Sequence, residues 1–212
     1  AAAGVVDVVQ IPDGIAVVAD TYWHAVKARD LLQINWDEGA NAGLTTAAMV
    51  AGTQAALASG KPVPHKKEGD ADGLVAAATK VVRAEYRTQN LSHAPMEPMN
   101  FTAHFQPDAQ GDRMLLVGPT QWPDAVQGAV AKLLGLKVEN VALENTFLGG
   151  GFGRRIDYDY ALQAAQIAKA VAGKPVKLIW SREDDMQHDY YRPLAVHQLA
   201  AALGADGKPA AL

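Results

Sequence analysis

The sequence predicts an α+β fold, in which strands and helices follow one another along 212 residues. Three observations support this prediction: short apolar runs typical of strands, helical stretches preceded by capping residues, and turn residues between them. The first example opens the chain, because Val5–Ile11 and residues 14–19 are apolar runs joined by Pro12-Asp13-Gly14, which is typical of a tight turn.

The expected helices have recognisable ends. Thr21 supplies a side-chain cap for the first helix, and Thr45 or Thr46 supplies one for the second. Pro123 is well suited to the first residue of the third helix, and Gly135 ends it. The expected helices are residues 22–32, 47–59, 123–134 and 158–172. The expected strands are residues 5–11, 14–19, 33–36, 74–87, 101–105, 113–117, 138–143 and 176–180.

Two of these helices have a predicted buried face. In residues 123–134 it consists of Val126, Val130 and Leu133. The helix over residues 158–172 carries small residues at helical spacing, which let a helix lie close to its neighbour. These small residues are Ala161, Ala165, Ala168 and Ala172.

Composition excludes several classes of function. The net charge of −4 and the isoelectric point of about 5.8 argue against a nucleic-acid partner. The absence of cysteine excludes disulfides, thiolate zinc sites and cysteine-held iron–sulfur clusters within these residues. No apolar run approaches the roughly 18 residues of a membrane span, and no signal peptide is recognisable. Residues 60–73 are polar and rich in Lys, Pro and Gly, which predicts a linker, and both ends suggest a piece of a longer chain.

The run Gly149-Gly150-Gly151-Phe152-Gly153, between a strand and a helix, is the first candidate site. Consecutive glycines let backbone N–H groups gather around an oxyanion, and Arg154 and Arg155 could pair with phosphate. The run lacks the third glycine of a dinucleotide fingerprint and the Gly-Lys-Ser/Thr of a P-loop, so a purely structural turn is the simpler explanation of the glycines alone. Phe152 favours a binding role, because a large apolar side chain in such a turn is expected to be held against a flat or apolar group.

Gln121 is a second candidate, because it stands in Gly118-Pro119-Thr120-Gln121-Trp122 at a strand end, where loops commonly carry function. Its amide could donate to a ligand oxygen, although capping or packing is the simpler role for a single Gln. His93 and Glu97 are too few for a metal site, so we expect a structural His and a buried, hydrogen-bonded Glu. The acidic run at residues 183–185 is better explained as a solvated helix start or turn than as a magnesium site. The polar and aromatic residues 188–197 are expected to form surface.

The order of these motifs resembles that of a known family. Thr120-Gln121, the glycine run and Trp180-Ser181-Arg182-Glu183-Asp184-Asp185-Met186 together resemble the molybdopterin-binding region of the xanthine dehydrogenase and aldehyde oxidase family. Ser92-His93-Ala94-Pro95-Met96-Glu97-Pro98 is similar to the start of that region, and Trp36-Asp37-Glu38-Gly39 to the hammerhead α/β domain before it. The resemblance implies a hammerhead-type domain with a linker in residues 1–73 and the N-terminal part of a molybdopterin-binding α+β domain in residues 74–212.

Within the family, Gly153-Arg154-Arg155 looks most like the large subunits of the isoquinoline 1-oxidoreductase type and related membrane-associated aldehyde dehydrogenases. The resemblance implies molybdenum bound as molybdopterin cytosine dinucleotide, with the Gln121 amide beside an oxygen ligand of the metal and the glycine run beside the metal or the pterin. The implied cofactor-binding residues are Gln121, Gly150, Gly151, Phe152, Gly153 and Arg154.

The resemblance also implies a reaction: hydroxylation with water as oxygen donor, with electrons passing to a small partner subunit that carries two [2Fe–2S] clusters. The general-base Glu of the family lies near the end of its full subunit. No catalytic residue and no metal ligand are therefore assigned here, and the isolated piece is expected to be inactive.

Ile156 departs from the purine-oxidising members of the family, which carry a substrate-binding Glu at this position. An apolar side chain here favours an aromatic N-heterocycle of the isoquinoline type, with an aldehyde as the alternative substrate. Relatives of this type are often exported, which suggests the periplasmic side of the inner membrane, although the residues themselves leave the localisation unknown. Two other hypotheses stay open, a non-enzymatic α+β interaction domain with a structural glycine turn and a nucleotide-binding enzyme of another class.

Overall fold

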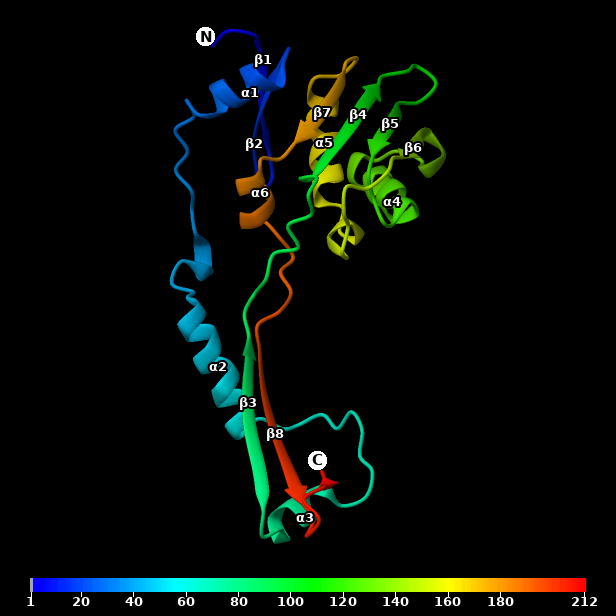
Figure 1. Ribbon diagram of the computed structural model, residues 1–212. Helices are drawn as coiled ribbons and strands as arrows, with labels where there is room; N and C mark the ends of the chain where they lie inside the picture. Colours follow the sequence, from blue (N-terminus) through cyan, green and yellow to red (C-terminus); the bar gives the residue numbers. More distant parts are fainter. Residues whose placement is uncertain (1) are drawn as a thin grey trace. The chain divides into compact units, whose positions relative to one another are not determined.

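The computed structural model describes residues 2–212 and contains helices and strands in alternation, which confirms the predicted α+β class (Figure 1). The chain forms two compact units, each defined by the contacts of its own residues. Unit 1 comprises residues 2–36 and 92–190, and unit 2 comprises Asp37–Leu91 and Tyr191–Leu212. This division does not test the domain boundary expected after residue 73, which stays a prediction.

Unit 1 begins with the predicted hairpin of β1 (Val5–Ile11) and β2 (Gly14–Ala19), which pair antiparallel. Helix α1 (Tyr22–Arg29) follows, and the Thr21 hydroxyl accepts a hydrogen bond from the backbone N–H of His24, as an N-cap does. The helix ends earlier than residue 32, the end expected from the sequence.

The main sheet of unit 1 has four strands in the order β6-β5-β4-β7. Their bounds are β4 (Asn100–Gln106), β5 (Arg113–Gly118), β6 (Val141–Asn145) and β7 (Pro175–Ile179). Strand β4 is antiparallel to β5 and β7, whereas β5 and β6 are parallel and connected by helix α4 (Pro123–Leu134). Because β5 and β6 run in the same direction, the loops that follow them lie at one edge of the sheet. This edge therefore holds both Gln121 and the glycine run.

Helix α4 has the predicted limits, and Gly135 ends it in a left-handed conformation with φ of 71°. Val126 and Val130 are fully buried as predicted, but Leu133 is 43% exposed. The buried row continues four residues after Val130, at Leu134, which packs against the core.

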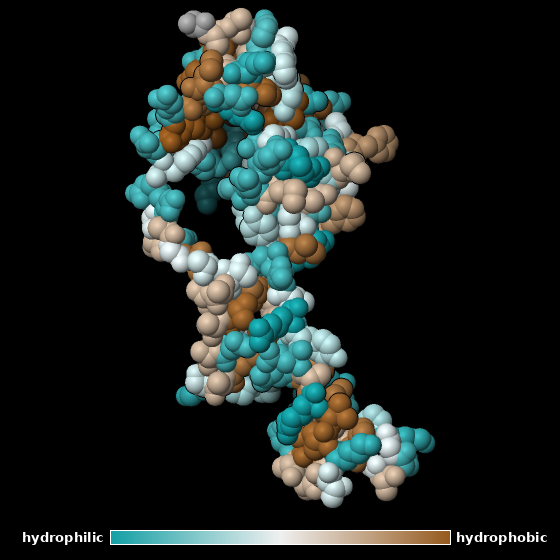
Figure 2. Space-filling view, turned by 60° about the vertical axis from the view of Figure 1, so that its left-hand side comes forward, coloured by the Kyte–Doolittle hydropathy of each residue, from teal (hydrophilic) through white to brown (hydrophobic). Residues whose placement is uncertain are grey.

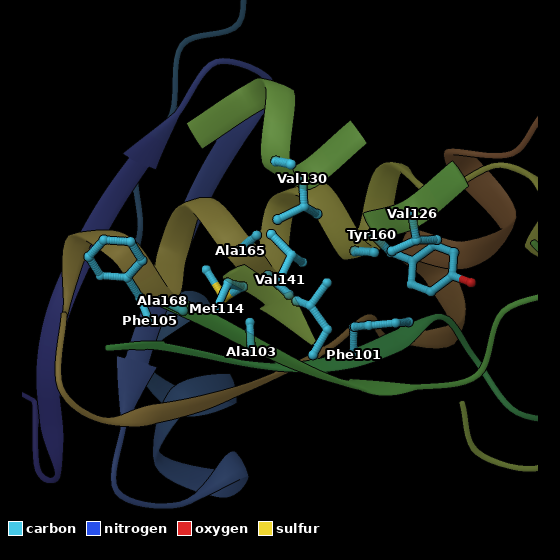
Figure 3. Packing of buried hydrophobic residues seen from close by; sticks show 14 of the residues in the cluster. Phe101, Ala103, Phe105, Met114, Val126, Val130, Val141, Tyr160, Ala165 and Ala168 are labelled. Carbon is cyan, nitrogen blue, oxygen red and sulfur yellow. The ribbon is translucent and has the colours of Figure 1, made fainter. Parts of the chain in front are cut away.

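The core of unit 1 lies between the four-stranded sheet and helices α4 and α5 (Asp159–Ala170), as Figure 3 shows. The ring centroid of Tyr160 in α5 lies 5.7 Å from the ring centroid of Phe101 in β4. The predicted small residues of α5 are fully buried, except that Ala172 lies beyond the end of the helix and is exposed. The buried ones are Ala161, Ala165 and Ala168.

Residues 33–36, expected as a strand, are irregular and lead to a 3-10 turn, η1 (Gly39–Asn41). The prediction is wrong here because a strand needs a hydrogen-bonded partner, and none of the strands in the described chain pairs with these residues. The strand expected from residue 138 starts at Val141, because the preceding residues form a 3-10 turn, η2 (Val138–Asn140).

Unit 2 contains a three-stranded sheet in the order β3-β8-β9, with β3 (Val81–Thr88), β8 (Ala195–Leu203) and β9 (Pro209–Ala211). The strand expected over residues 74–87 begins later than predicted, because helix α3 (Ala71–Ala77) occupies the start of this segment. The side chain of Asp70 caps this helix.

Helix α2 (Thr46–Ser59) of the same unit begins where predicted, with Thr45 as its N-cap. Residues 60–70 contain neither helix nor strand, as expected for a linker, but the linker is shorter than the predicted residues 60–73 because residues 71–73 belong to α3. No helix within residues 2–212 combines the length and the apolar character needed to cross a membrane.

Candidate functional site

The structure brings together the two parts of the site that the sequence predicted. Gln121 lies in the loop after β5, and residues 149–153, hereafter the glycine loop, lie in the loop after β6. The backbone N–H of Gln121 donates to the carbonyl of Arg155 at 2.9 Å. In return, Gln121 Oε1 accepts from the backbone N–H groups of Gly153 at 3.1 Å and Arg155 at 3.3 Å. One glutamine side chain thus holds the end of the glycine loop.

The glycine loop has an unusual backbone conformation. Gly150 and Gly153 have φ values of 97° and 98°, which glycine adopts without a steric penalty. Phe152 also lies in the left-handed region, with φ of 54°. For a residue with a side chain this conformation costs about 1 kcal/mol, so surrounding contacts must impose it.

The glycines are also required by the side chains packed against them. A Cβ on Gly151 would lie 2.6 Å from Gln121 Oε1, and a Cβ on Gly150 would lie 3.2 Å from the Cβ of Pro95. A Cβ on Gly149 would overlap the side chain of Glu97. The loop therefore packs closely on residues 95–97 and on Gln121. The sequence indicated Gln121 as a second candidate of the same site, but it did not indicate that Pro95 and Glu97 are neighbours of the loop.

Glu97 holds the start of the glycine loop. Its Oε2 accepts from the backbone N–H of Gly149 at 2.8 Å, and its own N–H donates to the Gly149 carbonyl at 3.0 Å. The Asn100 side chain donates to Glu97 Oε1 at 2.8 Å. Glu97 is hydrogen-bonded, as expected, although it is only partly buried.

Arg155 connects the glycine loop to Glu97 from inside the protein. The residue is fully buried, and its Nε donates to the Gly150 carbonyl at 2.8 Å. Its Nη2 donates to Glu97 twice, to the carbonyl at 2.7 Å and to Oε2 at 3.0 Å. Its charge therefore stabilises the contact between the loop and residue 97 and is not available to a ligand.

Arg154 is likewise fully buried. Its Nη1 and Nη2 donate to the two carboxylate oxygens of Asp159 at 3.0 and 2.9 Å. Its Nε lies 3.1 Å from Asp189 Oδ1 but without hydrogen-bond geometry, so this contact is an ion pair only. Three aromatic rings surround the guanidinium at 5.2 to 5.9 Å, those of Tyr160, Trp180 and Tyr190. The phosphate pairing expected for this side chain is therefore not supported, because the guanidinium is already paired inside the protein.

The middle of the glycine loop carries free hydrogen-bond donors. The backbone N–H groups of Gly150, Gly151 and Phe152 have no acceptor among residues 2–212, and neither has the Nε2 of Gln121. The orientation of the Gln121 amide follows from the two N–H groups that Oε1 accepts, which leaves the NH2 group pointing away from the loop backbone. Successive unpaired N–H groups in a turn of this kind form a site for an anion or an oxygen ligand.

Apolar side chains are exposed beside these donors. Both apolar and polar residues contribute to the surface, as the brown and teal areas of Figure 2 show. Phe152 is 67% exposed and Ile156 is 44% exposed, and Trp122 next to Gln121 is exposed as well. Most of the Phe152 ring is therefore exposed, and the apolar contact expected for it stays a prediction.

His93 has the polar partner expected of a structural His, since its ring Nδ1 lies 3.0 Å from Asp189 Oδ1. The acidic run is a helix start as expected: Ser181 and Asp184 form a capping box at α6 (Arg182–Gln187). Asp185 is buried instead of solvated. No group of three His, Asp or Glu side chains in the described residues could hold a metal ion.

The pKa of Glu97 is lowered from its usual value of 4.5. Burial acts in the opposite direction, but hydrogen bonds from Asn100 and Gly149 and the charge of Arg155 outweigh it. A carboxylate whose pKa is lower in the folded state than in the unfolded state stabilises the fold. This stabilisation is fully present above the pKa of the unfolded state and is lost as the pH falls through the pKa of the folded state.

We therefore expect Glu97→Gln to destabilise the protein most above about pH 5, with the difference from the wild type shrinking below about pH 4. Melting temperatures of both proteins over this pH range measure the effect. Glu139→Gln, at an exposed position, serves as the control and should show a small difference at every pH. A difference for Glu97→Gln that does not change with pH would contradict the assignment.

Comparison with known proteins identifies the family of the chain. A family described as the molybdopterin cofactor-binding domain matches residues 54–212. The chain belongs to this family. The resemblance expected from the motifs is thus confirmed, and the glycine loop, Gln121 and Glu97 all lie within the matched residues.

Relatives with curated names include both heterocycle and aldehyde enzymes. Isoquinoline 1-oxidoreductase subunit beta of Brevundimonas diminuta is 33% identical over 99% of this chain and 27% of its own length. Membrane-bound aldehyde dehydrogenase (pyrroloquinoline-quinone) of Gluconacetobacter polyoxogenes is 32% identical over 93% of this chain and 25% of its own length. The chain thus spans about a quarter of these members of its family.

Solved structures show the same fold. Quinoline 2-oxidoreductase from Pseudomonas putida 86 superposes with a TM-score of 0.69 at 21% identity, over 91% of this chain and 25% of that protein. Aldehyde oxidoreductase from Desulfovibrio gigas has a TM-score of 0.67 at 20% identity, over 91% of this chain and 21% of that protein.

Proposed function

We propose that this chain is part of the molybdenum-cofactor-binding subunit of an oxidoreductase that hydroxylates aromatic N-heterocycles of the isoquinoline type, with water as the oxygen donor. The observation that carries the proposal is the row of free donors formed by the N–H groups of Gly150, Gly151 and Phe152, with Gln121 Nε2 beside it. Such donors fit the oxygen atoms around molybdenum and on a pterin dinucleotide, because these atoms are hydrogen-bond acceptors.

The residues of the site have different roles in this proposal. The three N–H groups and the amide of Gln121 contact the cofactor, and Gly153 is needed for the turn and for its hydrogen bond to Gln121. Arg154 holds the loop from inside through Asp159, so we assign it a supporting role in place of the cofactor contact expected from the sequence. Rigid support of this kind keeps donors in place before a ligand binds, which lowers the cost of binding.

The cofactor in this proposal is molybdopterin cytosine dinucleotide, which supplies the oxidation chemistry. We also propose, from the family resemblance, that the electrons leave to a small partner subunit with two [2Fe–2S] clusters; these 212 residues contain no cysteine that could hold such a cluster. No residue of this chain is proposed as the general base, so the isolated piece is expected to be inactive.

The proposed substrate follows from the apolar side chains beside the donors. Ile156 presents an exposed branched side chain, and Phe152 an exposed ring, which suit a flat apolar ring better than a polar purine. The name of the Brevundimonas diminuta relative supports a heterocycle, and that of the Gluconacetobacter polyoxogenes relative supports an aldehyde as the second candidate. The turnover rate with isoquinoline, compared with the rate with an aliphatic aldehyde, distinguishes the two candidate substrate classes.

Cofactor analysis of the full-length subunit, purified with its partner, tests the proposal. We expect about one molybdenum and one cytidine monophosphate released on hydrolysis per subunit. A preparation that is active without molybdenum, or that contains pyrroloquinoline quinone instead, would contradict the proposal.

Gln121→Glu separates the two roles of this side chain. The carboxylate keeps an acceptor for the N–H groups of Gly153 and Arg155 but loses the free donor. We expect kcat to fall by about 100-fold at an unchanged melting temperature, as for the loss of one donor to a reacting group. Gln110→Glu, at an exposed position, is the control. An unchanged kcat for Gln121→Glu would exclude a donor role for Gln121.

A further inference from the structure

His93 lies beside the glycine loop and is not used in the proposed function. Its backbone N–H donates to Asp189 Oδ2 at 2.6 Å, and its ring Nδ1 is 3.0 Å from Asp189 Oδ1. The Ser92 hydroxyl donates to the same carboxylate at 2.7 Å. Asp189 is only 1% exposed, so one buried carboxylate fixes both the backbone and the ring of His93. The same carboxylate contacts Arg154, the residue that follows the glycine loop.

The second ring nitrogen of His93 faces the loop. Among the atoms around Gly153, His93 Nε2 is the one that a Cβ there would approach, at 3.9 Å. Nε2 has no hydrogen-bond partner among the residues described. The only fully buried side-chain nitrogen or oxygen without a partner in residues 2–212 is Arg154 Nε, so His93 Nε2 reaches solvent beside the loop.

The charged groups around this ring come from three segments. Asp189, after helix α6, contacts Nδ1, and Arg154 contacts Asp189 from the other side. Asp157, between η3 (Arg154–Ile156) and α5, is close enough for the charges of His93, Arg154 and Asp189 to act on its carboxylate. Hydrogen bonds thus hold His93 on Asp189, and the ring nitrogen of His93 that has no partner among the described residues lies beside Gly153, at the end of the glycine loop.

We propose that His93 is a further ligand-contacting residue of this site and that Asp189 is its positioning residue. The protonated imidazole donates from Nε2 to an acceptor oxygen, carbonyl or phosphate, of the cofactor held on the glycine loop; this inference rests on the proposed function. With Nδ1–H directed at a carboxylate, only the doubly protonated ring has a donor at Nε2. Retention of the cofactor should therefore weaken as the pH rises.

The test uses the full-length subunit with its partner and measures the rate at which molybdopterin is released, followed by the fluorescence of the free pterin at about pH 6 and about pH 9. We expect the wild type to release the cofactor about tenfold more slowly at the lower pH, as for the gain of one charge-assisted hydrogen bond. His93→Gln should release it about tenfold faster than the wild type at the lower pH and lose the pH dependence. Asp189→Asn should shift the rate in the same direction, because the ring is no longer held.

His197→Gln, an exposed His on β8, is the matched control and should keep the pH dependence of the wild type. Melting temperatures of the cofactor-free variants show whether a variant fails simply to fold. A release rate of His93→Gln equal to that of the wild type at both pH values would overturn the inference. Faster release with an intact pH dependence would overturn it too, since it would show a structural role only. A wild-type subunit without any molybdopterin would instead overturn the proposed function itself, and the inference with it.

Discussion

Gly151→Ala is expected to reduce the molybdenum content of the full-length subunit at least about tenfold while most of the fold is kept. The added Cβ would lie 2.6 Å from Gln121 Oε1, so the glutamine side chain must move out of the loop. Two backbone N–H groups, those of Gly153 and Arg155, then lose their acceptor, and the free amide donor is displaced as well. Gly151 does not have a positive φ, so the effect comes from space and not from backbone strain.

Metal analysis by mass spectrometry and the melting temperature together measure this outcome. Gly128→Ala is the matched control, because a Cβ on Gly128 in helix α4 would meet nothing within 4 Å. It should keep the metal content and stabilise the helix by about 0.5–1 kcal/mol. If Gly151→Ala lowered the melting temperature but retained its molybdenum, the loop would be a structural turn and not a contact of the cofactor.

Asp159→Asn is expected to lower the free energy of unfolding by about 3 kcal/mol, because it leaves the buried guanidinium of Arg154 without its bidentate partner. This loss of stability lies near the lower end of the range for a broken buried ion pair, because Asp189 and the carbonyl of His188 remain close to the same guanidinium. The glycine loop ends at Arg154, so we expect cofactor release to become faster as well.

Denaturant unfolding followed by circular dichroism measures the stability change. Asp124→Asn provides the control: like Asp159 it lies in the first turn of a helix, but it is exposed. Removing its charge should cost only the helix-dipole contribution of about 0.3–1 kcal/mol. Equal losses for the two variants would mean that the contact between Arg154 and Asp159 contributes nothing beyond that dipole effect.

The glycine loop requires glycine for two separate reasons, one on each of its sides. On one side, Pro95, Glu97 and Gln121 occupy the space that side chains would take. On the other, three backbone N–H groups stay free because no side chain shields them. Structural and ligand-binding explanations of the glycines, which were alternatives from the residues alone, are therefore compatible in the folded protein.

Local features could be predicted from the sequence because they depend on residues near one another in the chain. The turn at Pro12-Asp13-Gly14, the cap at Thr21 and the end of α4 at Gly135 all involve neighbours within a few positions. Residues 33–36 show the limit of such reasoning. A strand forms only with a hydrogen-bonded partner, and the pattern of one segment does not contain that partner.

The candidate site shows the same division. The sequence by itself determined the α+β class, the glycine run as the place to look, Gln121 as its companion, and the family to which the chain belongs. Only the tertiary structure decided that Glu97 and Pro95 hold the loop, that Arg154 is paired inside the protein, and that His93 with Asp189 faces Gly153. The physical reason is that the contacts of Glu97 and His93 join residues tens of positions apart, whereas Arg154 and Asp159 are five positions apart but form a buried pair only once the core has packed around them. The parallel pairing of β5 and β6 brings Gln121 and the glycine loop to one edge of the sheet.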